Sequence, residues 1–295
     1  RKAAGFNAVR TAHNQPSTAF LDACDRAGLP VLDEAFDGRA KGKNPHDYHV
    51  EFNDWWQRDL DAMVRRDRNH PSVVIWSIGN EMYERAGAEG QRIAHELAGR
   101  IRELDATRPV GAGVNGVGAG GDWTQLDPLY AALDVAGYNY GLTRHAAHHA
   151  RLPQRVIMSS ESYQSEAFTN WAIVQDHPYV IGDFVWSAMD YLGEAGIGQV
   201  FPPGQPVLKH WEGNHYPWHG AYCGDIDLIG WRKPASHYRN VVENAGEKLY
   251  MAVIAPTADG KPWNLSPWSM PPAAPSWTWP TPVGTPLTVE VYSRY

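Results

Sequence analysis

Two glutamates, Glu81 and Glu161, each stand just after an apolar segment of the sequence. A carboxylate is costly to bury without a task, and the carboxyl end of a buried parallel strand is the usual place of a catalytic group in a (β/α)8 barrel. Two carboxyl groups at one such rim can divide a reaction, because one donates a proton while the other attacks a carbon atom. The alternative for Glu81 is a surface residue that caps a helix beginning near Tyr83.

The segment before Glu81 has the composition of a strand that is buried on both faces. Residues 73–78 form an almost unbroken apolar run that is rich in Val and Ile. Such a run is typical of a parallel sheet. Gly79, which permits close approach of the backbone, and Asn80 then lead into Glu81. We therefore expect a buried strand that delivers Glu81 to the edge of a sheet.

Similar apolar segments alternate with helical patterns along the chain, and most of them end in residues that could serve a site. This alternation predicts a parallel sheet, and functional residues at nearly every strand end favour a barrel over an open doubly wound sheet. The expected strands are 6–10, 29–32, 73–78, 109–114, 133–137, 155–159 and 179–186, and the expected helices are 18–27, 51–68, 90–104, 166–175 and 235–245.

A (β/α)8 TIM barrel needs one strand more than these, and we expect that first strand upstream of Arg1. Residues 1–255 are expected to form the barrel domain, with a long loop at 199–231 that walls a cleft. A Pro- and Trp-rich linker at 262–286 and an alternating strand at 287–292 follow. We expect residues 256–295 to hold this linker and the start of an all-β, immunoglobulin-like sandwich domain.

The bulk composition excludes several classes of protein. The net charge of −7 argues against a binder of nucleic acid or of membrane surfaces, and no apolar run is long enough to span a membrane. Two cysteines supply neither a disulfide framework nor a set of metal ligands. We expect a soluble protein, cytoplasmic or periplasmic. The 13 Trp and 14 Tyr suit either a sugar-binding cleft or a core rich in aromatic rings.

The spacing of the two glutamates matches three strands of a barrel, from the fourth to the seventh. That separation sets the two carboxyl groups opposite each other across the barrel mouth. Retaining glycosidases need such a pair roughly 5–5.5 Å apart, with one group protonating the leaving oxygen and the other attacking the sugar carbon.

Several motifs then resemble glycoside hydrolase family 2, which contains β-galactosidases, β-glucuronidases and β-mannosidases. The stretch from Arg68 to Glu81 resembles the acid/base signature of this family. Residues 6–13, 32–35 and 183–194 resemble its second, third and eighth strand motifs, in the right order. The tail from Trp277 onward is similar to the start of the immunoglobulin-like domain that follows the barrel in this family.

This resemblance implies a role for each matching residue. Glu81 is implied as the general acid/base and Glu161 as the nucleophile. Asn80 is implied to bind the sugar 2-hydroxyl, Tyr140 to orient Glu161, and Arg10 to hold Glu161 ionised. The other residues implied to line the sugar site are His13, Asp33 and Trp186. For His13 the alternative is a structural histidine, and for Trp186 it is core packing.

Departures from the family pattern narrow these expectations. Many members carry Glu-Tyr at the nucleophile, where this chain has Ser162 between Glu161 and a tyrosine, and Glu166 is the second candidate for that role. Gly38 and Ala40 stand where magnesium-dependent β-galactosidases have an acidic residue and a histidine. We therefore expect no metal site and no cofactor.

The sugar itself is inferred from a missing motif. The Asn-Lys pair with which β-glucuronidases hold a carboxylate is not evident, so a neutral sugar is favoured. We expect retaining hydrolysis of terminal β-D-galactosides or related oligosaccharides. The alternatives are a β-glucuronidase or β-mannosidase of the same family, or a barrel that binds carbohydrate without cleaving it. The family resemblance also makes a homo-oligomer an option for the full-length protein.

Overall fold

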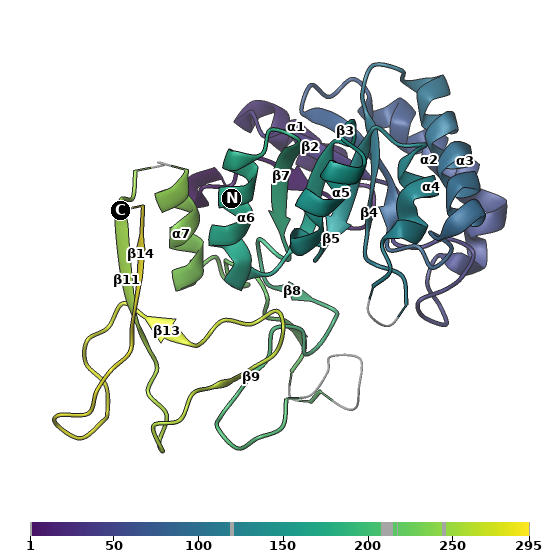
Figure 1. Ribbon diagram of the computed structural model, residues 1–295. Helices are drawn as coiled ribbons and strands as arrows, with labels where there is room; N and C mark the ends of the chain where they lie inside the picture. The colour runs from purple at the N-terminus through teal and green to yellow at the C-terminus, as the bar shows by residue number, and fades with distance from the viewer. Residues whose placement is uncertain (1, 119–120, 208–214, 217, 244–245, 295) are drawn as a thin grey trace. The chain divides into compact units, whose positions relative to one another are not determined.

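The computed structural model describes residues 2–118, 121–207, 215–216, 218–243 and 246–294 (Figure 1). The chain divides into two compact units, which we describe separately. The barrel unit comprises residues 7–162 and 172–184, and the C-terminal unit comprises residues 1–6, 163–171 and 185–295. Within the described residues, none of the helices combines the length and the apolar character that a membrane span requires.

The barrel unit is built on a seven-stranded sheet whose strands follow one another in sequence order, with helices alongside (Figure 1). Strands β1 to β6 pair in parallel, and β7 lies next to β6. A helix occupies each connection, as parallel strands require. The expected partial (β/α)8 barrel is thereby confirmed. The strands are β1 (Val9–Arg10), β2 (Val31–Glu34), β3 (Val73–Asn80), β4 (Val110–Val114), β5 (Val135–Asn139), β6 (Ile157–Ser162) and β7 (Val180–Val185).

The helices of the connections are α1 (Thr18–Ala27), α2 (His49–Asp67), α3 (Gly87–Leu104), α4 (Asp127–Tyr130), α5 (His145–Arg151) and α6 (Ala167–Asp176). Helix α1 has the predicted bounds because both of its ends carry strong signals. The Ser17 hydroxyl accepts a hydrogen bond from the Phe20 N–H, and Gly28 leaves the helix at a left-handed φ of 60°.

Side chains of the sheet alternate between two faces. Val31, Trp76 and Ala136 belong to the large core that the sheet forms with the helices. We call the face of the sheet that carries these side chains the outer face. Leu32, Ile75 and Met158 meet in a separate cluster, on the face that we call the inner face. Because alternate residues of a strand share a face, this register decides which strand-end residues can meet.

The sequence did not anticipate every element of this unit. The short helices α4 and α5 were not expected. No helix begins near Tyr83, because residues 82–85 form a turn that Arg85 fastens with hydrogen bonds to the carbonyls of Met82, Asn115 and Gly116. Helix α3 begins at Gly87, three residues before the expected start at Gly90.

In its described residues, the C-terminal unit contains α7 (Pro234–Val242) and three small antiparallel sheets. Two of these sheets pair β8 (Tyr191–Leu192) with β10 (Gly220–Ala221) and β9 (Val200–Phe201) with β12 (Asn264–Leu265). The third contains β11 (Leu249–Ile254), β13 (Ala273–Ala274) and β14 (Val289–Ser293).

Strand β11 precedes the domain boundary expected at residue 255, whereas its partner β14 follows it. The expected linker at 262–286 carries β12 and β13, and part of the expected loop at 199–231 (208–214 and 217) lies outside the described residues. An immunoglobulin-like domain stays a prediction.

Candidate active site

Arg10, at the end of β1, is the centre of a buried polar network on the inner face. Its Nε and Nη2 donate hydrogen bonds to the two carboxylate oxygens of Glu34 at 3.0 and 2.9 Å. Its Nη1 donates to Oε1 of Glu161 at 2.8 Å and to the Ser160 carbonyl at 2.9 Å, and Nη2 also donates to Oδ1 of Asn80 at 2.8 Å. All five N–H groups of the guanidinium are thus used, and the side chain is only 4% exposed.

Glu34 is the carboxylate that anchors this guanidinium. Burial alone would raise its pKa, but the charges and hydrogen bonds of Arg10, His13 and Ser77 outweigh burial and lower the pKa to about 2. The Ser77 hydroxyl donates to Oε2 of Glu34 at 2.7 Å. Glu34 is therefore an ionised acceptor that orients Arg10.

Asp33, which we expected to line the sugar site, points the other way. It shares the outer face with Val31, is fully buried, and interacts with Asp67 of α2. Burial, followed by the neighbouring charge of Asp67, raises the pKa of Asp33 to about 8. Glu34 occupies the inner-face position instead, and strand alternation was the sequence signal that would have selected it.

Glu161 lies at the end of β6 and is nearly buried. Besides its ion pair with Arg10, its Oε1 lies 3.6 Å from Nε2 of His13. Its backbone carbonyl accepts a hydrogen bond from the Tyr140 N–H at 2.8 Å. Tyr140 has a left-handed φ of 55°, which an ordinary residue adopts only when its surroundings hold it there. The backbone of Tyr140 thus fixes the strand end that carries Glu161.

Glu81 directly follows β3 and is held in a different environment from Glu161. Its Oε1 accepts a hydrogen bond from Nδ2 of Asn139 at 2.9 Å, and its backbone N–H donates to the Gly113 carbonyl at 2.8 Å. Burial, followed by the negative charge of Glu161, raises the pKa of Glu81. Glu81 also has a left-handed φ of 40°.

Asn80 joins the two glutamates through a chain of hydrogen bonds. Its Oδ1 accepts from Arg10 and, at 2.9 Å, from Nδ2 of Asn139, which also bonds Glu81. Its Nδ2 lies 3.2 Å from Nε2 of His13. Because Nδ1 of His13 lies 2.8 Å from the Glu34 carboxylate, we assign the ring proton to Nδ1 and the acceptor role to Nε2.

Six of the residues selected from the sequence therefore lie together at the ends of the barrel strands. They are Arg10, His13, Asn80, Glu81, Tyr140 and Glu161. Sequence reasoning missed Glu34 and Asn139 as members. Asn139 was recognised only as part of a strand end, and its partners Glu81 and Asn80 lie 58 and 59 positions away in the chain.

Two further candidates, Trp186 and Glu166, belong to the C-terminal unit. The Trp186 indole N–H donates to the Tyr191 hydroxyl at 3.1 Å, and the ring is partly exposed. Glu166 ends a short 3-10 helix, and burial raises its pKa.

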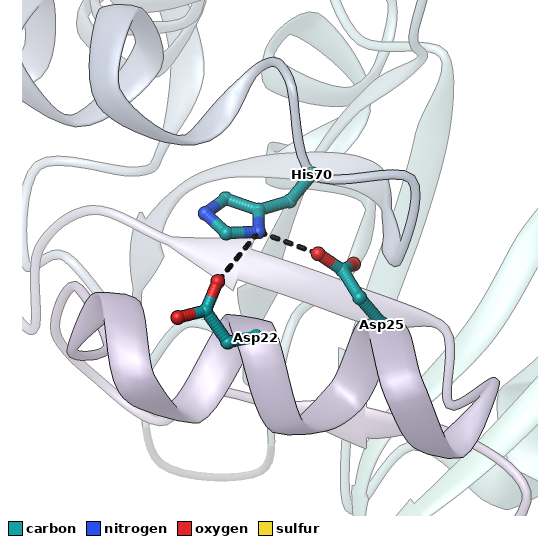
Figure 2. A group of neighbouring side chains, drawn as sticks. All are labelled: Asp22, Asp25 and His70. Atoms are coloured by element: carbon teal, nitrogen blue, oxygen red, sulfur yellow. Dashed lines mark hydrogen bonds and ion pairs between the residues drawn. The ribbon is translucent and has the colours of Figure 1, made fainter.

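Among the described residues, one group has the spacing of a metal site, namely Asp22 and Asp25 of α1 with His70 (Figure 2). Figure 2 shows both carboxylates directed at Nδ1 of His70, with Asp25 at 2.7 Å and Asp22 at 3.9 Å. Asp25 also accepts the Ser72 N–H at 2.9 Å. His70 precedes β3, so this group lies at the opposite end of the strand from Glu81, where Asp25 ties α1 to the turn.

Comparisons with known proteins agree with this geometry. The family model described as glycosyl hydrolases family 2, TIM barrel domain, matches residues 1–133. A solved family 2 member from Bacteroides cellulosilyticus is 44% identical, with a TM-score of 0.85 over 99% of this chain and 36% of that chain.

Two curated relatives are more distant. A β-galactosidase from Bacteroides ovatus is 29% identical over 79% of this chain, and a putative β-glucuronidase from Formosa agariphila is 28% identical over 65% of it. This chain spans 34% and 23% of their respective lengths. The chain is thus a segment of a glycoside hydrolase family 2 catalytic barrel.

Proposed function

We propose that the protein containing this chain hydrolyses terminal non-reducing β-D-galactosides with retention of configuration. Glu81 acts as general acid/base and Glu161 as nucleophile. The observation that carries the proposal is the unequal environment of the two carboxyl groups. Glu161 accepts a charge-assisted hydrogen bond from Arg10, whereas Glu81 accepts an amide N–H and has a raised pKa. An ionised nucleophile and a protonated acid are what a retaining glycosidase requires.

The reaction proceeds in two displacements. In the first, Glu161 attacks the anomeric carbon while Glu81 protonates the departing oxygen, which gives a glycosyl ester and a free alcohol. In the second, the Glu81 carboxylate removes a proton from water as the water attacks the anomeric carbon and frees Glu161. The negative charge of Glu161 disappears in the ester, so one cause of the raised pKa of Glu81 disappears with it. The pKa of Glu81 therefore falls in the ester intermediate, so the ionised Glu81 carboxylate is ready to act as the base.

The network around Arg10 supports this division of labour. The guanidinium bonds Glu34, Glu161 and Asn80 together, so the nucleophile and the residue before the acid are held in one frame. Asn80 is the residue proposed to bind the sugar 2-hydroxyl. Its amide is already hydrogen-bonded on both sides, so the substrate hydroxyl exchanges with one of these partners rather than filling an unused position.

A galactoside is proposed because the Bacteroides ovatus relative is named a β-galactosidase and no Asn-Lys pair for a sugar carboxylate is evident in the sequence. The alternatives are a β-glucuronide or a β-mannoside, since the second relative is named a putative β-glucuronidase. A barrel that binds carbohydrate without cleaving it remains the non-enzymatic alternative.

The test uses the full-length protein and a panel of nitrophenyl β-glycosides. We expect hydrolysis of the galactoside, with release of the β-anomer as the first product seen by proton NMR. Glu81→Gln and Glu161→Gln are both expected to lose this activity. Faster hydrolysis of the glucuronide or mannoside would change the sugar, and full activity in Glu161→Gln would overturn the assignment of the nucleophile.

A further inference from the structure

Lys43 reaches from the connection between β2 and α2 to the peptide bond that precedes Glu81. Its Nζ donates to the carbonyl oxygen of Asn80 at 3.2 Å and to Oδ1 of Asp37 at 2.7 Å. The same Asp37 oxygen lies 3.3 Å from Nδ2 of Asn80. Lys43 and Asp37 therefore contact both the backbone and the side chain of the residue next to the proposed acid.

The peptide between Asn80 and Glu81 is held on both of its polar sides. Lys43 binds its carbonyl oxygen, and the Gly113 carbonyl accepts its N–H at 2.8 Å. The orientation of this peptide plane sets the φ of Glu81, which is 40° and lies in the left-handed region that a residue with a side chain avoids. Such a conformation persists only when neighbouring groups hold it, and the ammonium of Lys43 is one of the two groups that do so here.

The connection that carries Lys43 is itself fixed. The carboxylate of Asp47 accepts hydrogen bonds from the backbone N–H groups of Lys43, Asn44 and His49, at 2.7 to 2.9 Å. The side chain of Lys43 is 18% exposed, so the ammonium is largely shielded from water. A preorganised and partly desolvated cation is effective at holding a carbonyl dipole.

We propose that Lys43 is a positioning residue for the general acid, which clamps the Asn80–Glu81 peptide and keeps the Glu81 carboxyl aimed at the leaving oxygen. This role rests on the proposed glycosidase function. The groups that face the Glu81 carboxyl are Asn139 from β5, Glu161 from β6, Arg85 from the turn after β3, and Lys43 itself. The positive charge of Lys43 also counteracts the rise in the pKa of Glu81 that burial and Glu161 cause.

The experiment compares Lys43→Met with wild type on two galactosides in the full-length protein. A dinitrophenyl leaving group departs without a proton, whereas an unsubstituted phenyl leaving group needs the general acid. We expect kcat/KM for the phenyl substrate to fall about tenfold more than for the dinitrophenyl substrate, as part of the ~10²–10⁴-fold that general acid catalysis contributes. The basic limb of the pH profile is expected to move to higher pH, because loss of a cation makes Glu81 harder to ionise.

Two further variants separate positioning from a general loss of structure. Lys41→Met is the matched control, because the Lys41 side chain is exposed and its backbone N–H, which the substitution leaves in place, donates to Glu84. Asp37→Asn keeps the Lys43 ammonium but weakens the ion pair that holds it. We therefore expect kcat/KM for the phenyl substrate to fall more than for the dinitrophenyl substrate, by a smaller factor than in Lys43→Met. An equal fall for both substrates in Lys43→Met, or an unmoved basic limb, would overturn the proposal.

A structure of the Lys43→Met variant gives a readout that does not depend on activity. We expect the Asn80–Glu81 peptide to rotate and Glu81 to leave the left-handed region. An unchanged peptide would contradict the clamp even if activity fell. If wild-type protein cleaved none of the glycosides, the proposed function would be overturned. If wild type were active and Lys43→Met kept the same activity, only the role of Lys43 would be overturned.

Discussion

Asn139, on β5, donates a hydrogen bond of 2.9 Å to the Glu81 carboxylate from the same amide nitrogen that bonds Asn80. Its own Oδ1 accepts the Ser160 hydroxyl at 2.6 Å, from the strand that carries Glu161. Asn139 therefore joins the β3 and β6 ends, each bearing one glutamate, in addition to the link that Arg10 makes between them. Its amide has a fixed orientation, because Ser160 occupies the oxygen and leaves the nitrogen for Glu81.

Asn139→Ala removes the amide N–H that favours the ionised form of Glu81. We expect the pKa of Glu81 to rise further, so the basic limb of kcat/KM moves to higher pH. Activity on a phenyl galactoside should fall by about tenfold or more, and activity on a dinitrophenyl galactoside by less. A pH profile that coincides with wild type would contradict this role for Asn139.

Arg10→Lys replaces a planar guanidinium, which has five N–H donors, by an ammonium of the same charge. A lysine has three donors and no planar geometry, so Glu34 and Glu161 cannot both keep their present hydrogen bonds. We expect a loss of stability of about 1–3 kcal/mol, because the lysine keeps the charge but leaves buried carboxylate oxygens without their hydrogen bonds. Urea unfolding measures this, with Arg92→Lys as the control because Arg92 forms an exposed pair on α3. Equal midpoints for the two variants would contradict the central position of Arg10.

Glu34 makes the stability of the barrel unit sensitive to acid. Its pKa in the folded protein is about 2, below the ordinary value of 4.5, so its contribution is complete above pH 4.5 and is lost as the pH falls through 2. Glu34→Gln cannot ionise and should lose this pH dependence along with stability near neutrality. The measurement is the urea midpoint between pH 2 and pH 7 for both proteins. Parallel curves would show that Glu34 is not the group responsible.

Asp33 affects the pH dependence of stability in the direction opposite to Glu34. Its pKa of about 8 lies above the ordinary 3.8, so the folded state holds a proton there that the unfolded chain releases, and stability falls as the pH rises from about 4 to 8. Asp33→Asn keeps the shape and donates a hydrogen bond without ionising. We expect this variant to gain stability relative to wild type as the pH rises towards 8, and a constant difference across that range would contradict the assignment.

Much of this architecture could be predicted from residue patterns. The apolar run at Val73 predicted β3, and Pro16, Ser17 and Gly28 predicted the bounds of α1. Such signals are local, because strand burial and helix capping depend on neighbouring residues.

The site was predicted less completely because its contacts are long-range. Arg10 reaches Glu34 across 24 positions and Glu161 across 151, and the register of separate strands decides these meetings. The choice of Asp33 instead of Glu34 shows the consequence, since one step along a strand moves a side chain to the other face. The left-handed conformation of Glu81 also has no sequence signal, because it depends on Lys43 and Gly113 from other segments.

The most direct test of the account is to trap the glycosyl ester. A 2-deoxy-2-fluoro-β-galactosyl fluoride slows both displacements but slows the second more, so the ester accumulates, and peptide mass spectrometry then identifies the residue that carries the sugar. We predict the label on Glu161, with hydrolysis of a nitrophenyl galactoside inhibited to the same extent as Glu161 is labelled. A label on Glu166 or Glu81, or inhibition without any covalent label, would contradict the assignment of Glu161 as the nucleophile.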